Sequence, residues 1–203
     1  MQPVQNEGKY TGEIFDNGVF SDALLRGASF SKCSFRNADL RETNTTGCMF
    51  DRCDFSNARL NASVHTHTAF TNCHFQKTAF LGAHFDNCKM TGSTFNGAAV
   101  AAISIVEGDW SYVSLRDSDL KGIDFRKVRL KEADMARCNL EKADFREADL
   151  TGAILSGSKL KEADFRGALI DGIDFGNVNL RGARFDFTQA IVIVQSLGAI
   201  VSG

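Results

Sequence analysis

Large apolar side chains recur at every fifth position along most of the chain. Between Tyr10 and Phe185 there are 36 such positions, and 34 of them carry a large apolar or aromatic residue. Sixteen of the 17 phenylalanines lie in this column, whose two polar exceptions are Thr45 and His65. A period of five fits neither the 3.6-residue period of a helix nor the two-residue period of a half-buried strand. The pattern therefore predicts a structure built from five-residue units.

The position two residues before each large residue is nearly always small. This small-residue column holds 13 Ala, all six Cys, four Ser, three each of Thr, Gly, Val and Ile, and one Glu. Two inward residues separated by one outward residue are typical of a short extended segment, and the remaining two residues of each unit predict a turn. Small residues beside large ones let stacked layers interdigitate, and stacking pairs the backbone groups of neighbouring coils. We therefore expect an all-β solenoid, with which the single proline of the chain agrees.

The repeating unit, as in Ala38-Asp39-Leu40-Arg41-Glu42, resembles the A(D/N)LXX pattern of pentapeptide-repeat proteins. The resemblance continues without insertion over residues 8–187. It implies a right-handed quadrilateral β-helix with four five-residue units in each coil, so that 36 units give nine coils. At about 4.8 Å between neighbouring strands, the rod is expected to be roughly 43 Å long. We expect an N-terminal tail at 1–7, the β-helix at 8–187, and a C-terminal cap and dimerisation segment at 188–203.

A coil of four units places Thr45 directly beside His65 in the interior of the β-helix. A buried polar group needs a hydrogen-bond partner, so we expect each to be the partner of the other in a structural polar patch, with a ligand site as the alternative. The same spacing stacks Cys33, Cys53 and Cys73. We interpret the cysteines as buried core residues, because metal binding requires thiolates that converge on one point, and we expect no disulfide.

The sequence contains no motif typical of an enzyme. It has no G-x-S-x-G elbow, no Walker loop and no H-E-x-x-H motif, and a uniform solenoid has no deep catalytic pocket. We therefore expect no catalytic, cofactor or metal site. One outward column rich in Thr and Ser is a weak argument for an ice-binding face, but Asp51, Lys131 and Asp171 interrupt it.

Composition restricts the compartment and the kind of partner. The net charge of −2, from 25 acidic and 23 basic residues, argues against nucleic-acid binding. No apolar leader precedes Tyr10, and the uncharged stretch 187–201 is shorter than the roughly 18 residues of a membrane-spanning helix. Six cysteines without a leader favour a reducing compartment. We expect a cytoplasmic protein that binds neither nucleic acid nor membrane.

The repeat stops at Phe187, and a segment of different character follows. We expect Thr188 to cap a short helix and Gly198 to end it, although the β-branched run 191–194 also favours a strand. An apolar end either caps the solenoid or joins two chains, and the two roles are compatible. Ile193 is expected to add apolar surface elsewhere, whereas the candidate dimerisation residues are Ala190, Ile191, Val194, Leu197 and Ile200.

This C-terminal segment sharpens the resemblance. A β-helix without loops that ends in such a segment is similar to the gyrase-protecting Qnr and MfpA branch of the family. The resemblance implies a homodimer joined through its C-terminus that imitates duplex DNA and binds DNA gyrase or topoisomerase IV. It also implies protection of the topoisomerase from quinolones or similar poisons. The alternative is a structural or protein-interaction β-helix with a different partner, because a fold does not fix a function.

The charge of the chain limits how far it can imitate DNA. Duplex DNA carries one negative charge per ~1.7 Å, or roughly 25 over the length of the rod, against a net −2 here. A local imitation remains, because residues 107–124 hold five acids and two bases. The candidate gyrase contacts are therefore Glu107, Asp109, Asp117, Asp119 and Asp124. A further acidic column (Asp124, Asp144 and Asp164) has arginines beside it (Arg126, Arg146 and Arg166), which favours a mutually paired surface.

Overall fold

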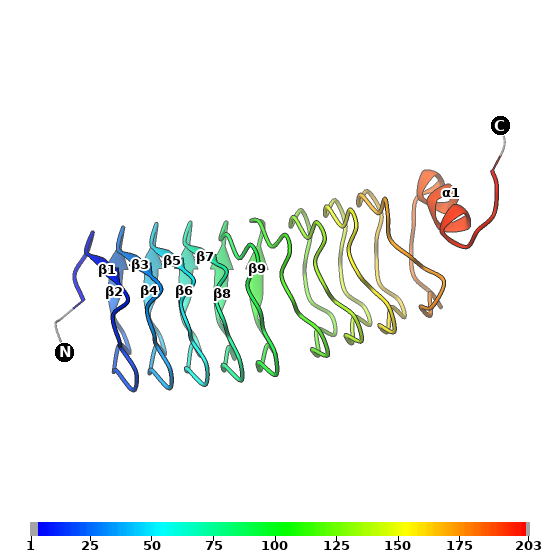
Figure 1. Ribbon diagram of the computed structural model, residues 1–203. Helices are drawn as coiled ribbons and strands as arrows, with labels where there is room; N and C mark the ends of the chain where they lie inside the picture. Colours follow the sequence, from blue (N-terminus) through cyan, green and yellow to red (C-terminus); the bar gives the residue numbers. More distant parts are fainter. Residues whose placement is uncertain (1–3, 202–203) are drawn as a thin grey trace.

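Neighbouring coils of the rod pair in parallel at a constant offset of four repeat units. The computed structural model describes residues 4–201, which form a row of stacked coils with one helix at the C-terminal end (Figure 1). One four-stranded sheet has the order β1-β3-β5-β7, with strands Lys9–Thr11, Ser29–Ser31, Met49–Asp51 and Ala69–Thr71. A five-stranded sheet has the order β2-β4-β6-β8-β9, with strands Leu24–Arg26, Asn44–Thr46, Val64–Thr66, His84–Asp86 and Ser104–Val106. The predicted all-β solenoid is confirmed.

Each coil has four sides, because one five-residue unit forms each side and the turn that follows it. Side A contains the five-stranded sheet, and side B contains the four-stranded sheet. Sides C and D are held by isolated parallel bridges that begin with Ile14↔Ser34 and Val19↔Asp39. Side B therefore lies opposite side D, and side A lies opposite side C.

The expected number of nine coils needs a correction. Continuous three-residue strands stack over only about five turns, as far as β9. Beyond β9 the same register continues as single bridges, from Asp109↔Arg129 to Asp164↔Arg184. Each side is so short, with a turn at both ends, that a small misalignment between coils leaves one bridge where a strand pair would otherwise form.

The large residues of the repeat fill the interior as stacks along the rod. Phe30, Phe50 and Phe70 lie face to face with ring centroids 4.7 and 4.8 Å apart, which is close to the spacing of paired strands. The six cysteines are buried and free, as their column predicts. The register between coils thus also sets the packing of the core.

The turn residue that follows each side adopts a left-handed conformation. Asn37 has φ 55° and Gly47 has φ 61°, and the same sign recurs at the corresponding position of most units. Glycine and asparagine tolerate this region better than other residues, which explains why they are frequent at this position.

The C-terminal segment is a helix rather than the alternative strand. Helix α1 spans Phe187–Ser196, and its N-cap is Asp186, so the predicted cap at Thr188 is wrong. The helix begins earlier because the side-chain oxygen Oε1 of Gln189 accepts the backbone N–H of Asp186 at 2.7 Å. Gly198, with φ 86°, follows the last turn as predicted. Of the expected terminal segments, residues 1–3 and 202–203 lie outside the described residues.

Candidate protein-interaction surfaces

The five acidic residues predicted to contact gyrase do not form one patch. Asp124 lies on side A, Asp109 on side B and Asp119 on side D, whereas Glu107 and Asp117 lie at corners of the rod. Asp124 lies in two surface grooves of about 380 Å³ each: it shares one with Glu107, Arg126 and Lys127, and the other with Asp119. The acids therefore surround the rod instead of facing one direction.

Two of these five acids are neutralised by arginine, and Asp117 is the first. Its two carboxylate oxygens accept hydrogen bonds of 2.6 and 2.7 Å from Arg137, which lowers the pKa of Asp117. Asp119 accepts a hydrogen bond of 2.8 Å from the side chain of Asn139, and Asp109 accepts one of 3.1 Å from the backbone N–H of Ser111. Glu107 makes no ion pair with any residue in the described range 4–201.

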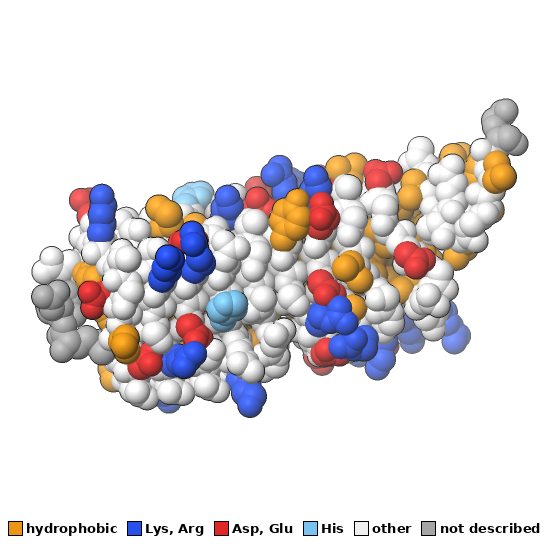
Figure 2. Space-filling view, viewed as in Figure 1, with side chains coloured by type: hydrophobic (Ala, Val, Ile, Leu, Met, Phe, Trp, Pro, Cys, Tyr) orange, Lys and Arg blue, Asp and Glu red, His pale blue; other side chains and the backbone are white. Residues whose placement is uncertain are grey.

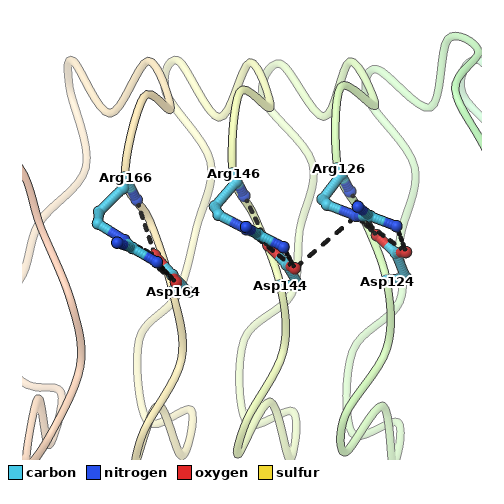
Figure 3. Close-up of polar contacts among 6 residues, drawn as sticks. All are labelled: Asp124, Arg126, Asp144, Arg146, Asp164 and Arg166. Carbon is cyan, nitrogen blue, oxygen red and sulfur yellow. Dashed lines mark hydrogen bonds and ion pairs between the residues drawn. The ribbon is translucent and has the colours of Figure 1, made fainter.

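The second paired acid, Asp124, begins the Asp–Arg ladder of side A, which Figure 3 shows. Each aspartate accepts a fork of hydrogen bonds from the arginine two residues later, and the Nη2–Oδ2 distance is 2.6 Å in all three coils. These hydrogen bonds lower the pKa of each carboxyl group. The Nε atom of Arg126 also lies 3.8 Å from an oxygen of Asp144 in the next coil. The predicted mutual pairing is confirmed, so this column is not a stripe of unpaired negative charge.

Acidic and basic side chains are interspersed along the visible face of the rod (Figure 2). Exposed ion pairs of this kind contribute about 0–1 kcal/mol each to stability. Their fields also cancel within a short distance, so a partner meets alternating charge. The surface therefore favours recognition by shape, with charge as a local contribution.

One face of α1 closes the end of the solenoid. The side-chain amide of Gln189 donates hydrogen bonds of 2.7 Å to the backbone carbonyls of Phe165 and Ala168. In the regular repeat the carbonyl at the position of Ala168 accepts a backbone N–H from the next coil, as Ala148 does from Leu169 at 2.9 Å, so Gln189 replaces this donor at the last coil. Val192 and Ile193 pack against the apolar core beside it. Sequence reasoning missed Gln189 and Val192, although Gln189, Val192, Ile193 and Ser196 recur at the spacing of one helical face.

The opposite face of α1 and the chain beyond it are apolar and exposed. Ile191, Val194 and Leu197 are 40, 42 and 59% exposed, and Ile200 is 96% exposed. Ala190 is also exposed, and Phe187 at 88% extends the same face. Figure 2 shows apolar side chains gathered at this end. All five candidate dimerisation residues thus lie on a free surface, whereas the residues that cap the core point the other way.

The two polar residues of the large-residue column are neighbours, as predicted. Thr45 and His65 are paired in the β4–β6 ladder, and Thr45 Oγ1 lies 2.7 Å from His65 Nδ1. Ser63 donates its hydroxyl proton to the carbonyl of Leu60 and lies 2.9 Å from His65 Nε2. Nε2 therefore carries the ring proton and donates it to Ser63, while Nδ1 accepts from Thr45.

This buried network has the properties of a structural element. Burial lowers the pKa of His65 to about 3, with a smaller contribution from the charge of His84, so the ring is neutral at pH 7. The ring also stacks on Phe85. Among residues 4–201, no group of three or more His, Cys, Asp or Glu side chains is arranged to hold a metal ion. In the same range, no helix has both the length and the apolar character needed to cross a bilayer.

Sequence comparison assigns the repeat to a known family. The Pentapeptide repeats family matches with eight copies, over residues 19–99 and 118–190 in overlapping segments. The chain belongs to the pentapeptide repeat family. No curated protein matches it in sequence.

Solved structures share this fold over nearly the whole chain. A trypsin-treated variant of QnrB1, described as a plasmid-mediated fluoroquinolone resistance protein, is 24% identical with a TM-score of 0.73, covering 98% of this chain and 99% of that one. Full-length QnrB1 is 22% identical with a TM-score of 0.61, covering 96% and 99%. At these identities the likeness establishes the fold.

Proposed function

We propose that this chain binds DNA gyrase or topoisomerase IV and protects it from quinolones or similar poisons. The observation that carries the proposal is the likeness to QnrB1, a fluoroquinolone resistance protein, over nearly the full length of both chains. The C-terminal segment supports the proposal, because this segment leaves an exposed apolar face at the end of the rod, to which a second copy of the chain can bind. The protein then acts by binding in the cytoplasm, without catalysis, a cofactor or direct contact with nucleic acid.

In this mechanism a two-fold dimer forms through Ala190, Ile191, Val194, Leu197 and Ile200. The dimer is a longer rod whose width and elongated shape let it occupy the DNA-binding surface of the topoisomerase. Shape supplies most of the recognition, because the net charge is only −2 and the acids of side A are paired with arginine. Glu107, Asp109 and Asp119, which have no arginine partner among the described residues, supply local negative charge; Asp117 and Asp124 contribute after rearrangement of their arginines.

A supercoiling assay with purified gyrase and a quinolone tests the proposal. Micromolar protein is expected to restore supercoiling in the presence of the drug. Replacing Ile191 and Val194 with Asp should abolish the protection together with the dimer, whereas Val19→Asp, at an exposed apolar position in the first coil, should retain both. A protein that is an intact dimer and has no effect on gyrase or topoisomerase IV refutes the function.

A second candidate is an interaction module for a partner other than a topoisomerase. The near-zero charge and the paired Asp–Arg ladder favour it, because both weaken the argument from DNA imitation. The salt dependence of binding to gyrase separates the candidates further: a contact through acidic residues weakens with ionic strength, whereas an apolar contact does not. Capture of a different protein from the source cell, with no gyrase bound, favours this second candidate.

A further inference from the structure

The backbone pairing between coils is interrupted on two adjacent sides at one place in the middle of the rod, in addition to a gap on side C of the last coil, between 153–158 and 173–178. In regular coils the N–H of an inward large residue donates to the carbonyl just before its counterpart in the next coil, as in Phe80 to Ala99 and Leu120 to Asn139, at 2.9 and 2.8 Å. Within the described residues 4–201, no backbone hydrogen bond or bridge joins 97–107 to 116–127. We call the space between these two segments the fissure.

The fissure opens on two adjacent sides and is closed on the other two. On side C the N–H of Phe95 still donates to the carbonyl of Ser114 at 2.9 Å, and on side B Trp110 donates to Arg129 at 2.7 Å. Between these points, on sides D and A, two surface grooves of about 380 Å³ each lie along the fissure. Strand β9 is consequently an edge strand in the middle of the rod. In Figure 1 the row of coils changes direction after β9.

The small-residue column explains why the coils part here. Ile103 and Ile123 occupy corresponding positions of this column in consecutive coils, so one is stacked directly on the other. Both are buried, with exposed fractions of 7 and 8%. At every other position of the column, Val or Ile has Ala, Ser or Gly as its neighbour in the next coil of the repeat. Two stacked isoleucines need more room than this column has, and overpacking is relieved by movement of the backbone.

The side opposite the fissure stays paired, with the N–H of Asp109 donating to the carbonyl of Cys88 at 2.9 Å. Gly108, on side B, has φ 96°, and a Cβ atom there would clash with the backbone carbonyl oxygen of Cys88 in the preceding coil. Only glycine allows this approach. The coils are therefore joined at the regular hydrogen-bonding distance on side B and are unpaired on side D, which is the geometry of a bend.

The interior packing also changes at this place. Aromatic contacts run from ring to ring between Tyr10 and Trp110, and a second series runs from Phe125 to Phe185. Within the described chain, no aromatic pair connects the two series. The family match likewise leaves residues 100–117 uncovered. The rod thus consists of two packed segments with different cores, joined across the fissure by side-chain contacts and two sides of backbone pairing.

We propose that the fissure is a hinge about which the two segments of the rod bend. In the neighbouring coils a change of angle breaks backbone hydrogen bonds on the side that opens, whereas on sides D and A of the fissure none are present to break. Bending therefore changes the packing of the side chains between the two segments, Ile103 and Ile123 among them, and breaks no backbone hydrogen bond on the open sides. A partner that lies along both segments selects one angle from those that the free rod adopts.

Two pairs of spin labels measure the bending directly. The pair Thr46→Cys and Arg166→Cys lies on the open side A, and the pair Asp51→Cys and Asp171→Cys lies on the closed side B. Both pairs span six coils, or roughly 29 Å at ~4.8 Å per coil, and the native cysteines are buried away from the label. The distance distribution across side A is expected to be broader than that across side B. Equal widths on the two sides overturn the hinge.

Replacing one of the stacked isoleucines tests the cause. In Ile123→Ala the fissure is expected to close. The distribution of distances between the two labels on side A should then become narrower, and its mean distance should become shorter. Val113→Ala removes a buried residue of the same column that lies between Ser93 and Ala133, and it should leave both distributions unchanged. The explanation by stacked isoleucines is wrong if Ile123→Ala leaves the side A distance distribution as broad as in the wild type. It is also wrong if Val113→Ala narrows that distribution by as much as Ile123→Ala does.

Amide hydrogen exchange tests the absence of backbone pairing at the fissure in the wild-type protein, so this test does not depend on whether the variants fold. The amides of Ile105 and Glu107 are expected to exchange more than about tenfold faster than those of Phe80 and Asn87, which donate to carbonyls in the next coil. In Ile123→Ala, or in Ile103→Ala if the first variant does not fold, their protection should rise by a similar factor. Equal protection of all four amides in the wild type would show that the ladder is closed in solution and would overturn the proposal.

Discussion

The buried imidazole of His65 makes the stability of the β-helix sensitive to mild acid. Folding lowers the pKa of this group from its usual 6.5 to about 3, chiefly through burial. As the pH falls below 6.5, the unfolded chain takes up a proton that the folded chain does not, so protonation favours unfolding. The contribution to stability is fully present above pH 6.5 and is lost progressively down to about pH 3.

The size of the effect follows from the two pKa values. Each pH unit between them changes the free energy of unfolding by about 1.4 kcal/mol, which gives a loss of about 2 kcal/mol between pH 7 and pH 5. The aspartates with perturbed pKa values do not interfere, because arginine partners or hydrogen bonds hold their pKa values below 3.8 and they titrate at lower pH.

The variant His65→Phe isolates this contribution. Phenylalanine continues the stack on Phe85, Ser63 keeps its hydrogen bond to Leu60, and Thr45 keeps Thr68 as a partner at 2.9 Å. Urea unfolding at pH 7, 6 and 5 is expected to show the loss of about 2 kcal/mol in the wild type and almost none in His65→Phe. His74→Gln, which removes an exposed imidazole, should retain the wild-type loss. The same pH dependence in wild type and His65→Phe would refute the reasoning.

Three further outcomes follow from the packing and the C-terminal end. Gln189→Leu leaves the carbonyl of Ala168 without its donor, whereas the carbonyl of Phe165 keeps the backbone N–H of Ala168 at 2.9 Å. The variant should lower the free energy of unfolding by about 1–3 kcal/mol in urea titration, since a buried unsatisfied group costs about this much. The exposed Gln195→Leu should change it by less than about 0.5 kcal/mol, and an equal effect of the two would contradict the cap. Ile191→Asp with Val194→Asp should be monomeric by light scattering at a concentration where Val19→Asp remains dimeric; if it remains dimeric, α1 is only a cap. A disulfide reagent at pH 8 should modify none of the six thiols until the protein unfolds, because all six are buried. Burial also raises the pKa of Cys88 to about 12 and that of Cys138 to about 11, which keeps these thiols protonated. Rapid reaction of the folded protein with the reagent would contradict this packing.

The sequence by itself determined the all-β solenoid of five-residue units, because one column of large residues and one of small residues can be buried when such units stack; the coil of four units was implied by the resemblance to the family. With that coil length the sequence also predicted the contact between Thr45 and His65, since residues 20 apart are neighbours in consecutive coils. It predicted the pairing of the Asp–Arg ladder for the same reason.

The tertiary structure alone decided how the regular coils end and where they part. Gln189 caps the rod because its amide nitrogen reaches two carbonyls of the last coil. The start of α1 at Phe187 depends on the other end of the same amide, whose oxygen accepts the N–H of Asp186. The five acids of 107–124 are close together in the chain, yet the coil distributes them around its sides, and Asp124 shares a groove with Glu107 and another with Asp119. Ile103 and Ile123 are each compatible with the small-residue column when considered alone. Their combined volume becomes too large only when the two coils stack, because neighbouring side chains in a packed interior share the same space.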